Sequence, residues 1–312
     1  MRDHEVFPTM ITPYNADGTV DYGAVEALTE WYAEQGCTGI FAVCQSSESA
    51  YLTLNERMRI ARRVAETASG LRKKGKKLTI VASGHVSDSD KEQREELCAM
   101  AQTGIDALIL VSNRIDAENT SEENWIEGLY RTLEWLPSGL DLGIYECPKP
   151  YKRLMTEKML QACLAVGRFR FMKDTCCDAE LIRKRLKLLR GSEFALYNAN
   201  AQTLLQTLHD GAAGYCGVMA NFHPDLYAWM CEHFEDKEEA AKLLQSFFTV
   251  SAFTESLCYP VTAKYHLSEL KGIRMRWDSR SADASLLTEY QKNCIKDMER
   301  LAAYFRERLK QA

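Results

Sequence analysis

The feature that most constrains the fold is a series of short apolar runs, each followed by a turn and a segment of helical periodicity. The runs lack the alternation of a half-exposed strand, so each predicts a strand buried on both faces, as in a parallel sheet. The first is a short run that opens residues 5–14 and turns at Thr12-Pro13, and the others cover residues 39–44, 78–84, 107–111, 142–145, 169–172, 194–197 and 214–219. About eight such strand–helix units close a (β/α)8 TIM barrel of the α/β class, so we expect that fold.

The strand signal ends near Asp236. Two segments of helical periodicity follow, at residues 238–253 and 286–309, with a turn-rich break between them. No low-complexity linker separates these segments from the barrel. We therefore predict a (β/α)8 barrel catalytic domain at residues 1–232 and a C-terminal helical domain at residues 233–312 that packs on it.

Charge and composition exclude several classes of protein. The formal net charge of −5 and the lack of a basic patch argue against a nucleic-acid partner. No run approaches the ~18 apolar residues that span a bilayer, and residues 1–5 lack the apolar core of a signal peptide. The eleven cysteines are scattered and form no CxxC pair, a pattern typical of reduced thiols. We therefore expect a cytoplasmic protein with no membrane partner.

Lys173 and Tyr145 are the strongest catalytic candidates. Lys173 directly follows one predicted buried strand, and Tyr145 is the last residue of another. In barrels of this kind the active site lies at the C-terminal ends of the strands. An amine held in a dry setting loses part of its preference for the charged form and can attack a carbonyl carbon. A tyrosine on the neighbouring strand can move protons. Alternatively, Lys173 is an ordinary surface lysine and Tyr145 a core tyrosine whose hydroxyl reaches the wet rim.

Two carboxylates, Glu146 and Asp174, flank this pair in the sequence. They fit general acids or bases, or structural groups that bond to backbone amides or to a neighbouring arginine. No cluster of His, Asp and Glu has the spacing of metal ligands, and no glycine-rich phosphate loop is present. The sequence therefore disfavours a metal-dependent aldolase.

Seven groups of short motifs, each present once, follow one another along the chain. They are Thr12-Pro13-Tyr14 with Asp17-Gly18; residues 44–48 with Leu52-Thr53 and Glu56-Arg57; Tyr145-Glu146-Cys147-Pro148; Met172-Lys173-Asp174; residues 211–214; residues 220–224; and Tyr259-Pro260-Val261 with Lys264. In order and spacing they resemble the pyruvate-dependent class I aldolases of the dihydrodipicolinate synthase and N-acetylneuraminate lyase superfamily. The resemblance covers nearly the whole chain.

The resemblance implies roles for the matching positions. Lys173 matches the lysine that forms a Schiff base with the substrate, and Tyr145 matches the tyrosine that shuttles protons. The substrate-binding candidates are Gln45, Ser46, Ser47, Thr175, Asn198, Asn200 and Cys216. The implied partners are a small 2-oxo acid and an aldehyde, and the implied assembly is a homotetramer built as a dimer of dimers. The covalent imine on Lys173 implies no cofactor.

Several positions depart from the family pattern. Gln45 replaces a hydroxyl residue of the carboxylate-binding loop, and both glycines of that loop are absent, which predicts a reshaped carboxylate site. Arg114 stands where the synthase has a tyrosine that reaches the neighbouring subunit, and Pro150 stands where it has an arginine. Both losses argue against dihydrodipicolinate synthase activity.

The stretch from Lys173 through Thr175 to Asp178 is instead similar to the lyase branch of the superfamily. Ala201 and Gln202 stand where that branch has an acidic pair that holds sugar hydroxyls. We therefore expect an aldolase or lyase that cleaves or forms a C–C bond of a sugar-acid-like 2-oxo acid, with pyruvate as one product or substrate. Two alternatives stay open: a synthase-type condensation of pyruvate with an aldehyde, and a non-catalytic 2-oxo-acid-binding regulatory protein.

Overall fold

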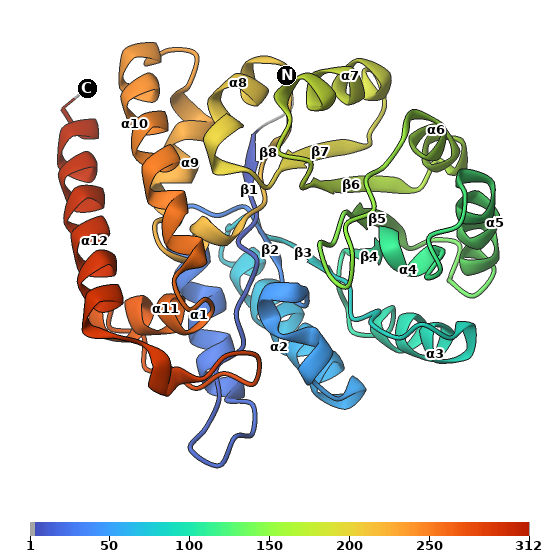
Figure 1. The fold of residues 1–312 in the computed structure, drawn as a ribbon, viewed down its shortest axis with the longest axis horizontal. Helices are drawn as coiled ribbons and strands as arrows, with labels where there is room; N and C mark the ends of the chain where they lie inside the picture. Colours follow the sequence, from blue (N-terminus) through green and yellow to red (C-terminus); the bar gives the residue numbers. More distant parts are fainter. Residues whose placement is uncertain (1–3, 312) are drawn as a thin grey trace.

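The computed structural model describes residues 4–311, and its centre is an eight-stranded parallel barrel (Figure 1). The strands are β1 (Glu5–Val6), β2 (Gly39–Phe41), β3 (Thr79–Ala82), β4 (Ala107–Val111), β5 (Asp141–Tyr145), β6 (Phe169–Asp174), β7 (Ala195–Asn198) and β8 (Gly214–Tyr215). Strand β1 pairs with β8, and a parallel bridge from Thr9 to Phe41 joins the segment after β1 to β2. The predicted (β/α)8 architecture is confirmed.

Helices follow the strands and surround the barrel. They are α1 (Tyr22–Glu34), α2 (Leu54–Lys73), α3 (Asp90–Met100), α4 (Ser112–Ile115), α5 (Glu122–Leu133), α6 (Glu157–Val166), α7 (Ala179–Leu189), α8 (Leu204–His209) and α9 (Pro224–His233). Most begin where the sequence offers a capping side chain, because an oxygen there accepts one of the free backbone N–H groups of the first turn. Thr53, Ser121, Thr156 and Asp178 act in this way before α2, α5, α6 and α7.

The strand residues alternate between two apolar clusters. Ile109, Tyr145 and Phe171 belong to a small cluster inside the barrel, whereas Leu108 and Met172 belong to the large core between strands and helices. This period of two is expected of a closed barrel. It decides which strand-end side chains reach the mouth of the barrel and which reach the helices.

The C-terminal helical extension is also confirmed. Helix α10 (Glu238–Ser251), the 3-10 segment η5 (Ala252–Ser256), α11 (Val261–Tyr265) and α12 (Glu289–Leu309) follow α9. Helix α12 runs beside α10 and also contacts α9 and α11 (Figure 1). The predicted boundary at 232/233 falls in the last turn of α9, and the division into two domains stays a prediction.

The predicted strands at residues 39–44, 78–84 and 214–219 each extend at least two residues beyond the strands in the structure. The run at residues 214–219 leaves the sheet after Tyr215, because the chain passes Gly217 and enters a 3-10 turn, η4 (Val218–Asn221). The short strand predicted at the start of residues 5–14 is β1, and Thr9 and Tyr14 of the same run lie in isolated bridges. Most side chains of residues 5–14 and 214–219 are buried even where the backbone has left the sheet. An apolar run therefore does not mark the residue at which a strand ends.

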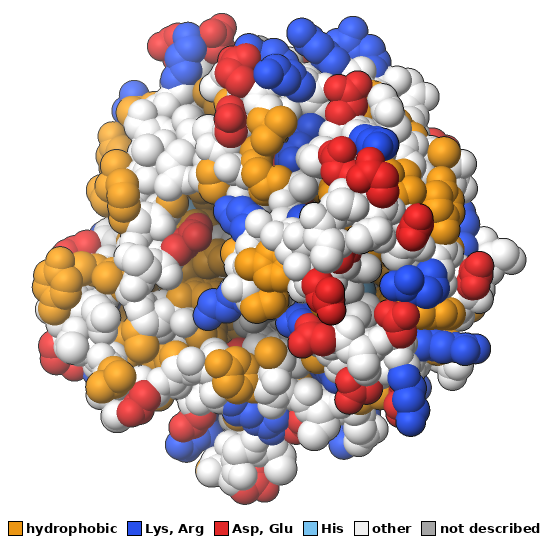
Figure 2. Space-filling view, turned by 45° about the vertical axis from the view of Figure 1, so that its right-hand side comes forward, with side chains coloured by type: hydrophobic (Ala, Val, Ile, Leu, Met, Phe, Trp, Pro, Cys, Tyr) orange, Lys and Arg blue, Asp and Glu red, His pale blue; other side chains and the backbone are white. Residues whose placement is uncertain are grey.

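Lys and Arg side chains are interspersed with Asp and Glu over the face in Figure 2, and the surface is hollowed left of centre. Across residues 4–311, no helix combines the length and the apolar character needed to cross a membrane.

Candidate active site

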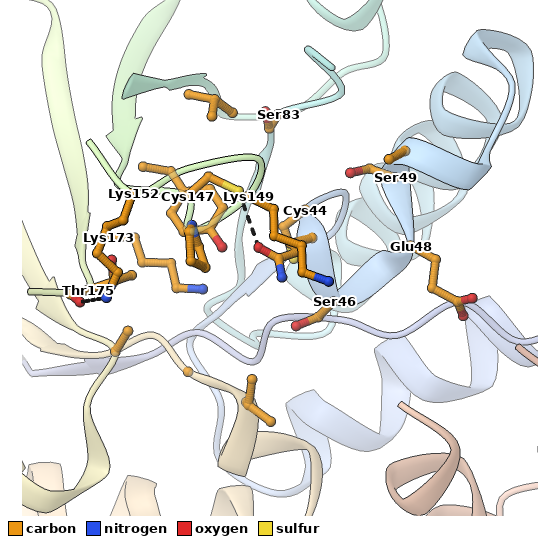
Figure 3. Close-up of a pocket in the computed structure, with 18 of the residues that line it drawn as sticks. Cys44, Ser46, Glu48, Ser49, Ser83, Cys147, Lys149, Lys152, Lys173 and Thr175 are labelled. Atoms are coloured by element: carbon orange, nitrogen blue, oxygen red, sulfur yellow. Dashed lines mark hydrogen bonds between the residues drawn. The ribbon is translucent and has the colours of Figure 1, made fainter. Parts of the chain in front are cut away.

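A cavity of about 670 Å³ lies at the C-terminal ends of the strands (Figure 3). Strands β5 and β6 supply Tyr145 and Lys173 to its lining, and the loops after β2 and β5 supply residues 44–46, 48–51, 147–150 and Lys152. Residues 199–202 and 217–218, together with Glu255, Tyr259 and Pro260 of the C-terminal extension, also line the cavity. The C-terminal extension therefore contributes to the site together with the barrel.

Lys173 and Tyr145 are partners in register across β5 and β6. Their exposed fractions are only 5% and 3%. The Lys173 Nζ lies 4.4 Å from the centre of the Tyr145 ring and 5.8 Å from that of Phe41. Burial raises the pKa of Tyr145 well above its ordinary value, and the neighbouring Cys147 and Cys44 thiols raise it further. The Tyr145 hydroxyl is therefore protonated at neutral pH and can donate a proton or a hydrogen bond.

Glu146 and Asp174 turn away from the cavity and pair with Arg185 of α7. The Arg185 guanidinium lies 2.7 Å from Glu146 Oε1 and also contacts Asp174, and all three side chains are buried. Burial, and then the charge of Asp174, raise the pKa of Glu146 to about 7, while Arg185 opposes the shift. This cluster fixes the backbone next to Tyr145 and Lys173. The structural interpretation of the two carboxylates, pairing with a neighbouring arginine, is the one found.

The loop after β2 forms a 3-10 turn, η1 (Gln45–Ser47). Ser46 lines the cavity and donates a hydrogen bond of 3.0 Å to the Thr9 hydroxyl. Gln45 accepts a contact of 3.3 Å from the Cys147 thiol. The amides of Gln45 and Ser46 belong to the first turn, where the turn itself offers no acceptor. These two residues line the same cavity as Lys173, and the Ser46 hydroxyl is already engaged with Thr9.

The two positions where the family loop has glycine do not need glycine conformations in this chain. Cys44 has an extended backbone with φ −151°, and Ser47 is not among the residues with positive φ. The left-handed conformation falls on Glu48, with φ 61°. Its buried carboxylate pairs with Lys264 at 2.8 Å and accepts the backbone N–H groups of Arg280 and Ser281. These contacts tie the loop to the C-terminal extension.

The cavity brings together most of the predicted site residues. Its lining contains Lys173, Tyr145, Gln45, Ser46, Thr175 and Asn200. Thr175 donates its hydroxyl to the Glu146 carbonyl at 2.7 Å, so this hydroxyl already has an internal partner. Whether each of these residues binds substrate stays a prediction.

Ser47, Asn198 and Cys216 lie behind the cavity wall and are absent from its lining. The Ser47 hydroxyl donates to the carbonyl of Met10 at 2.6 Å, and the Asn198 amide donates to Thr207 at 2.9 Å. Cys216 is fully buried, which raises its thiol pKa to about 12. Their predicted direct contact with substrate is untested, but the structure assigns the Ser47 and Asn198 side chains to internal hydrogen bonds.

The lining also contains residues that were not predicted as site residues, among them Lys149, His85, Glu255 and Tyr259. Tyr259 was matched only as part of a family motif. Lys149 follows the Tyr145 strand by four positions, so the strand-end rule could have found it. Glu255 comes from η5, far along the chain, and no periodicity or spacing indicates that this segment reaches the barrel mouth. Within residues 4–311, no group of three or more His, Cys, Asp or Glu is arranged to hold a metal ion.

Comparisons with known proteins agree with this geometry. A family model described as the dihydrodipicolinate synthetase family matches residues 3–300. The 4-hydroxy-tetrahydrodipicolinate synthase of Shewanella piezotolerans (strain WP3 / JCM 13877) is 26% identical over 295 residues, covering 91% of this chain and 96% of that protein.

Two solved structures share the fold along almost the full length. A sialic acid aldolase from Ruminococcus gnavus has a TM-score of 0.85 at 18% identity and covers 99% of both chains. DHDPS from Cyanidioschyzon merolae, solved with lysine bound, has a TM-score of 0.82 at 22% identity, covering 96% of this chain and 98% of that chain. At these identities the two structures show the fold alone.

Proposed function

This chain belongs to the dihydrodipicolinate synthetase family, and we propose that it makes or breaks a C–C bond of a 2-oxo acid through an imine on Lys173. Pyruvate is the 2-oxo acid consumed or released. The observation that carries the proposal is the in-register pairing of buried Tyr145 and Lys173 in the lining of one cavity. No metal or organic cofactor takes part in the proposed reaction.

The proposed cleavage begins when the Lys173 amine attacks the C2 ketone. Loss of water from the resulting carbinolamine gives an iminium, whose nitrogen can accept an electron pair. A base then removes the proton of the C4 hydroxyl, the C3–C4 pair moves into an enamine, and an aldehyde leaves. Protonation at C3 and addition of water release pyruvate and free Lys173. The condensation is the same sequence in reverse.

Tyr145 is the proposed proton carrier at the imine carbon. Its hydroxyl is protonated at neutral pH because burial raises its pKa. It can therefore donate to the departing C2 hydroxyl, and the resulting phenolate would accept a proton later in the cycle. The substrate carboxylate would bind the amides of Gln45 and Ser46 with the Ser46 hydroxyl, a set of donors suited to a carboxylate.

We propose a sugar-acid-like substrate for this site. Arg114, at the position of the synthase tyrosine, pairs with Asp88 of the same chain. Pro150 stands at the position of the synthase arginine, and the cations beside it in the lining are Lys149 and Lys152. Polar lining residues remain beyond Lys173, including Asn200 and Gln202. These groups suit a hydroxylated chain better than the single carboxylate of a synthase aldehyde.

We also propose a homotetramer built as a dimer of dimers in a reducing cytoplasm. The family relationship supports the assembly, and the free state of all eleven cysteines within residues 4–311 supports the compartment. Sedimentation equilibrium would give a mass four times the 35.5 kDa of one chain. A mass of one chain at micromolar concentration would refute the assembly.

Trapping with borohydride tests the proposed function. The protein is incubated with pyruvate and reduced, and the expected result is a mass adduct on the peptide that contains Lys173. Lys173→Ala is the control and should give no adduct. A protein that forms no adduct with any 2-oxo acid is not a class I aldolase, and binding without an adduct would favour the regulatory alternative. With an adduct in hand, panels of sugar 2-oxo acids and of aldehydes separate lyase from synthase activity.

A further inference from the structure

Glu255 is an unassigned carboxylate in the same cavity as Lys173. It belongs to η5, which connects α10 to the segment before α11, and it is only partly exposed. The charge of Lys173 acts on it directly, since the Lys173 ammonium lowers the pKa that burial raises. The C-terminal extension thus brings one acidic side chain into the electrostatic range of the proposed nucleophile.

The Glu255 carboxylate has no hydrogen bond or ion pair among residues 4–311. The other acidic residue of the lining, Glu48, is held by Lys264 and by the backbone of residues 280–281. Glu146 and Asp174 are held by Arg185 outside the cavity. A partly buried carboxylate without a partner carries a desolvation cost. Within the described part of the chain, Glu255 is therefore the lining carboxylate available to a substrate.

We propose that Glu255 is a catalytic acid–base residue that exchanges a proton with C3 of the 2-oxo acid held as an imine on Lys173. This assignment rests on the imine chemistry proposed above. Tyr145 is a weak candidate for the same step, because its hydroxyl is protonated at neutral pH and is a poor base. Glu255 complements it as the proton acceptor in the same cavity.

The electrostatic setting suits this role. Burial raises the pKa of Glu255 to about 7, so both protonation states are populated near neutral pH, where a general base works best. Lys173 on β6 is the charged group that opposes the shift. The other titratable groups coupled to Glu255 are Tyr215 on β8, Tyr227 on α9 and Tyr259 before α11.

The step balances without a further reactant. The Glu255 carboxylate takes a proton from C3 of the iminium, the C3–H electron pair forms the C2=C3 bond, and the C=N pair moves to the Lys173 nitrogen. The neutral enamine and a protonated Glu255 result. In reverse, the carboxyl proton returns to C3. In D2O the carboxyl proton exchanges with solvent, so repeated turnover places deuterium in the methyl group of pyruvate.

The test measures this exchange by proton NMR with pyruvate as the probe, so the unknown aldehyde is not needed. We expect Glu255→Gln to keep the borohydride adduct on Lys173 but to lose methyl exchange by on the order of 10²-fold. The exchange rate of the wild type should rise as the pH increases through about 7. The exchange rate of Glu255→Gln should not show this rise. Glu255→Asp should recover part of the rate. Glu239→Gln, an exposed carboxylate on α10, is the matched control and should exchange like the wild type.

Three results would overturn the assignment. One is an exchange rate in Glu255→Gln equal to that of the wild type. Another is an exchange rate in that variant that still rises with pH near 7. Loss of the adduct in Glu255→Gln would place the residue in imine formation instead of at C3. Absence of the adduct in the wild type would refute the proposed function itself, so the two failures are distinguishable.

Discussion

Replacement of Arg185 by Met should destabilise the protein strongly and in a pH-dependent way. Arg185 is 3% exposed and joins Glu146 and Asp174, whose side chains are fully buried. It also donates to the Met155 carbonyl at 2.6 Å. The Met side chain fills a similar volume but leaves two neighbouring carboxylates without their cation.

The magnitude follows from the burial of the three groups. Removing one partner of a buried ion pair costs about 3–5 kcal/mol, because the remaining charge stays desolvated. The loss is full only while both carboxylates are charged. The pKa of Glu146 in the wild type is already raised to about 7, and loss of the guanidinium raises it further. A raised carboxyl pKa gives stability at low pH that disappears as the pH rises through that pKa.

Urea denaturation followed by circular dichroism at pH 8 and pH 5.5 measures both effects. We expect a loss of about 3–5 kcal/mol at pH 8, which shrinks by on the order of 1–2 kcal/mol at pH 5.5 because one pKa unit corresponds to ~1.4 kcal/mol. Arg183→Met on the same helix is the control. Arg183 is 35% exposed and pairs with Glu180 and Asp210 at the surface, so its loss should be about 0–1 kcal/mol. Equal losses for the two variants at pH 8, or a pH-independent loss for Arg185→Met, would refute the reasoning.

Three further variants test other parts of the site. Tyr145→Phe should still form the Lys173 adduct, but more slowly by on the order of 10²-fold, because its hydroxyl is the proposed donor to the departing C2 hydroxyl, and an unchanged rate of adduct formation would remove its assigned role. Lys264→Met should cost about 3–5 kcal/mol in urea denaturation, because it leaves Glu48 buried without its cation; a loss under ~1 kcal/mol would mean that the backbone donors suffice. Glu255→Gln should stabilise the protein above pH 7, because the wild-type pKa of about 7 means that stability falls as the pH rises from the unfolded value towards it. The gain, ~1–2 kcal/mol after allowance for partial exposure, should vanish at pH 4, and a gain that persists there would contradict this explanation.

The sequence predicted the barrel and the central pair because both depend on local patterns. Continuous apolar runs indicate strands buried on both faces, and the polar residue at the end of each run indicates the mouth of the barrel. Tyr145 and Lys173 meet in register as that logic requires. Capping side chains at Thr53, Ser89, Ser121, Thr156 and Asp178 are likewise local features that mark helix starts.

Neighbouring side chains of similar type could not be sorted in this way. Ser46 and Ser47 both follow β2, but the 3-10 turn directs Ser46 to the cavity and Ser47 to the Met10 carbonyl. Asn198 pairs in register with Asp174, so it shares the outward face of that carboxylate and not the inward face of Lys173. Strand-end position alone does not determine the face, because a shift of one residue reverses it.

Glu255 lay beyond prediction for a different reason. Its place depends on how α10 ends, on the 3-10 segment that follows, and on the packing of the extension against the barrel. These are contacts between segments far apart in the chain, and no local pattern encodes them. Tertiary packing thus adds a carboxylate to a site whose lysine and tyrosine are visible in the sequence.

The most direct test of the central claim is a crystal structure of the protein soaked with pyruvate. The imine mechanism predicts continuous electron density from the Lys173 Nζ to C2 of pyruvate, with the carboxylate at the amides of Gln45 and Ser46. Pyruvate bound without a covalent link, or bound away from Lys173 at full occupancy, would contradict it.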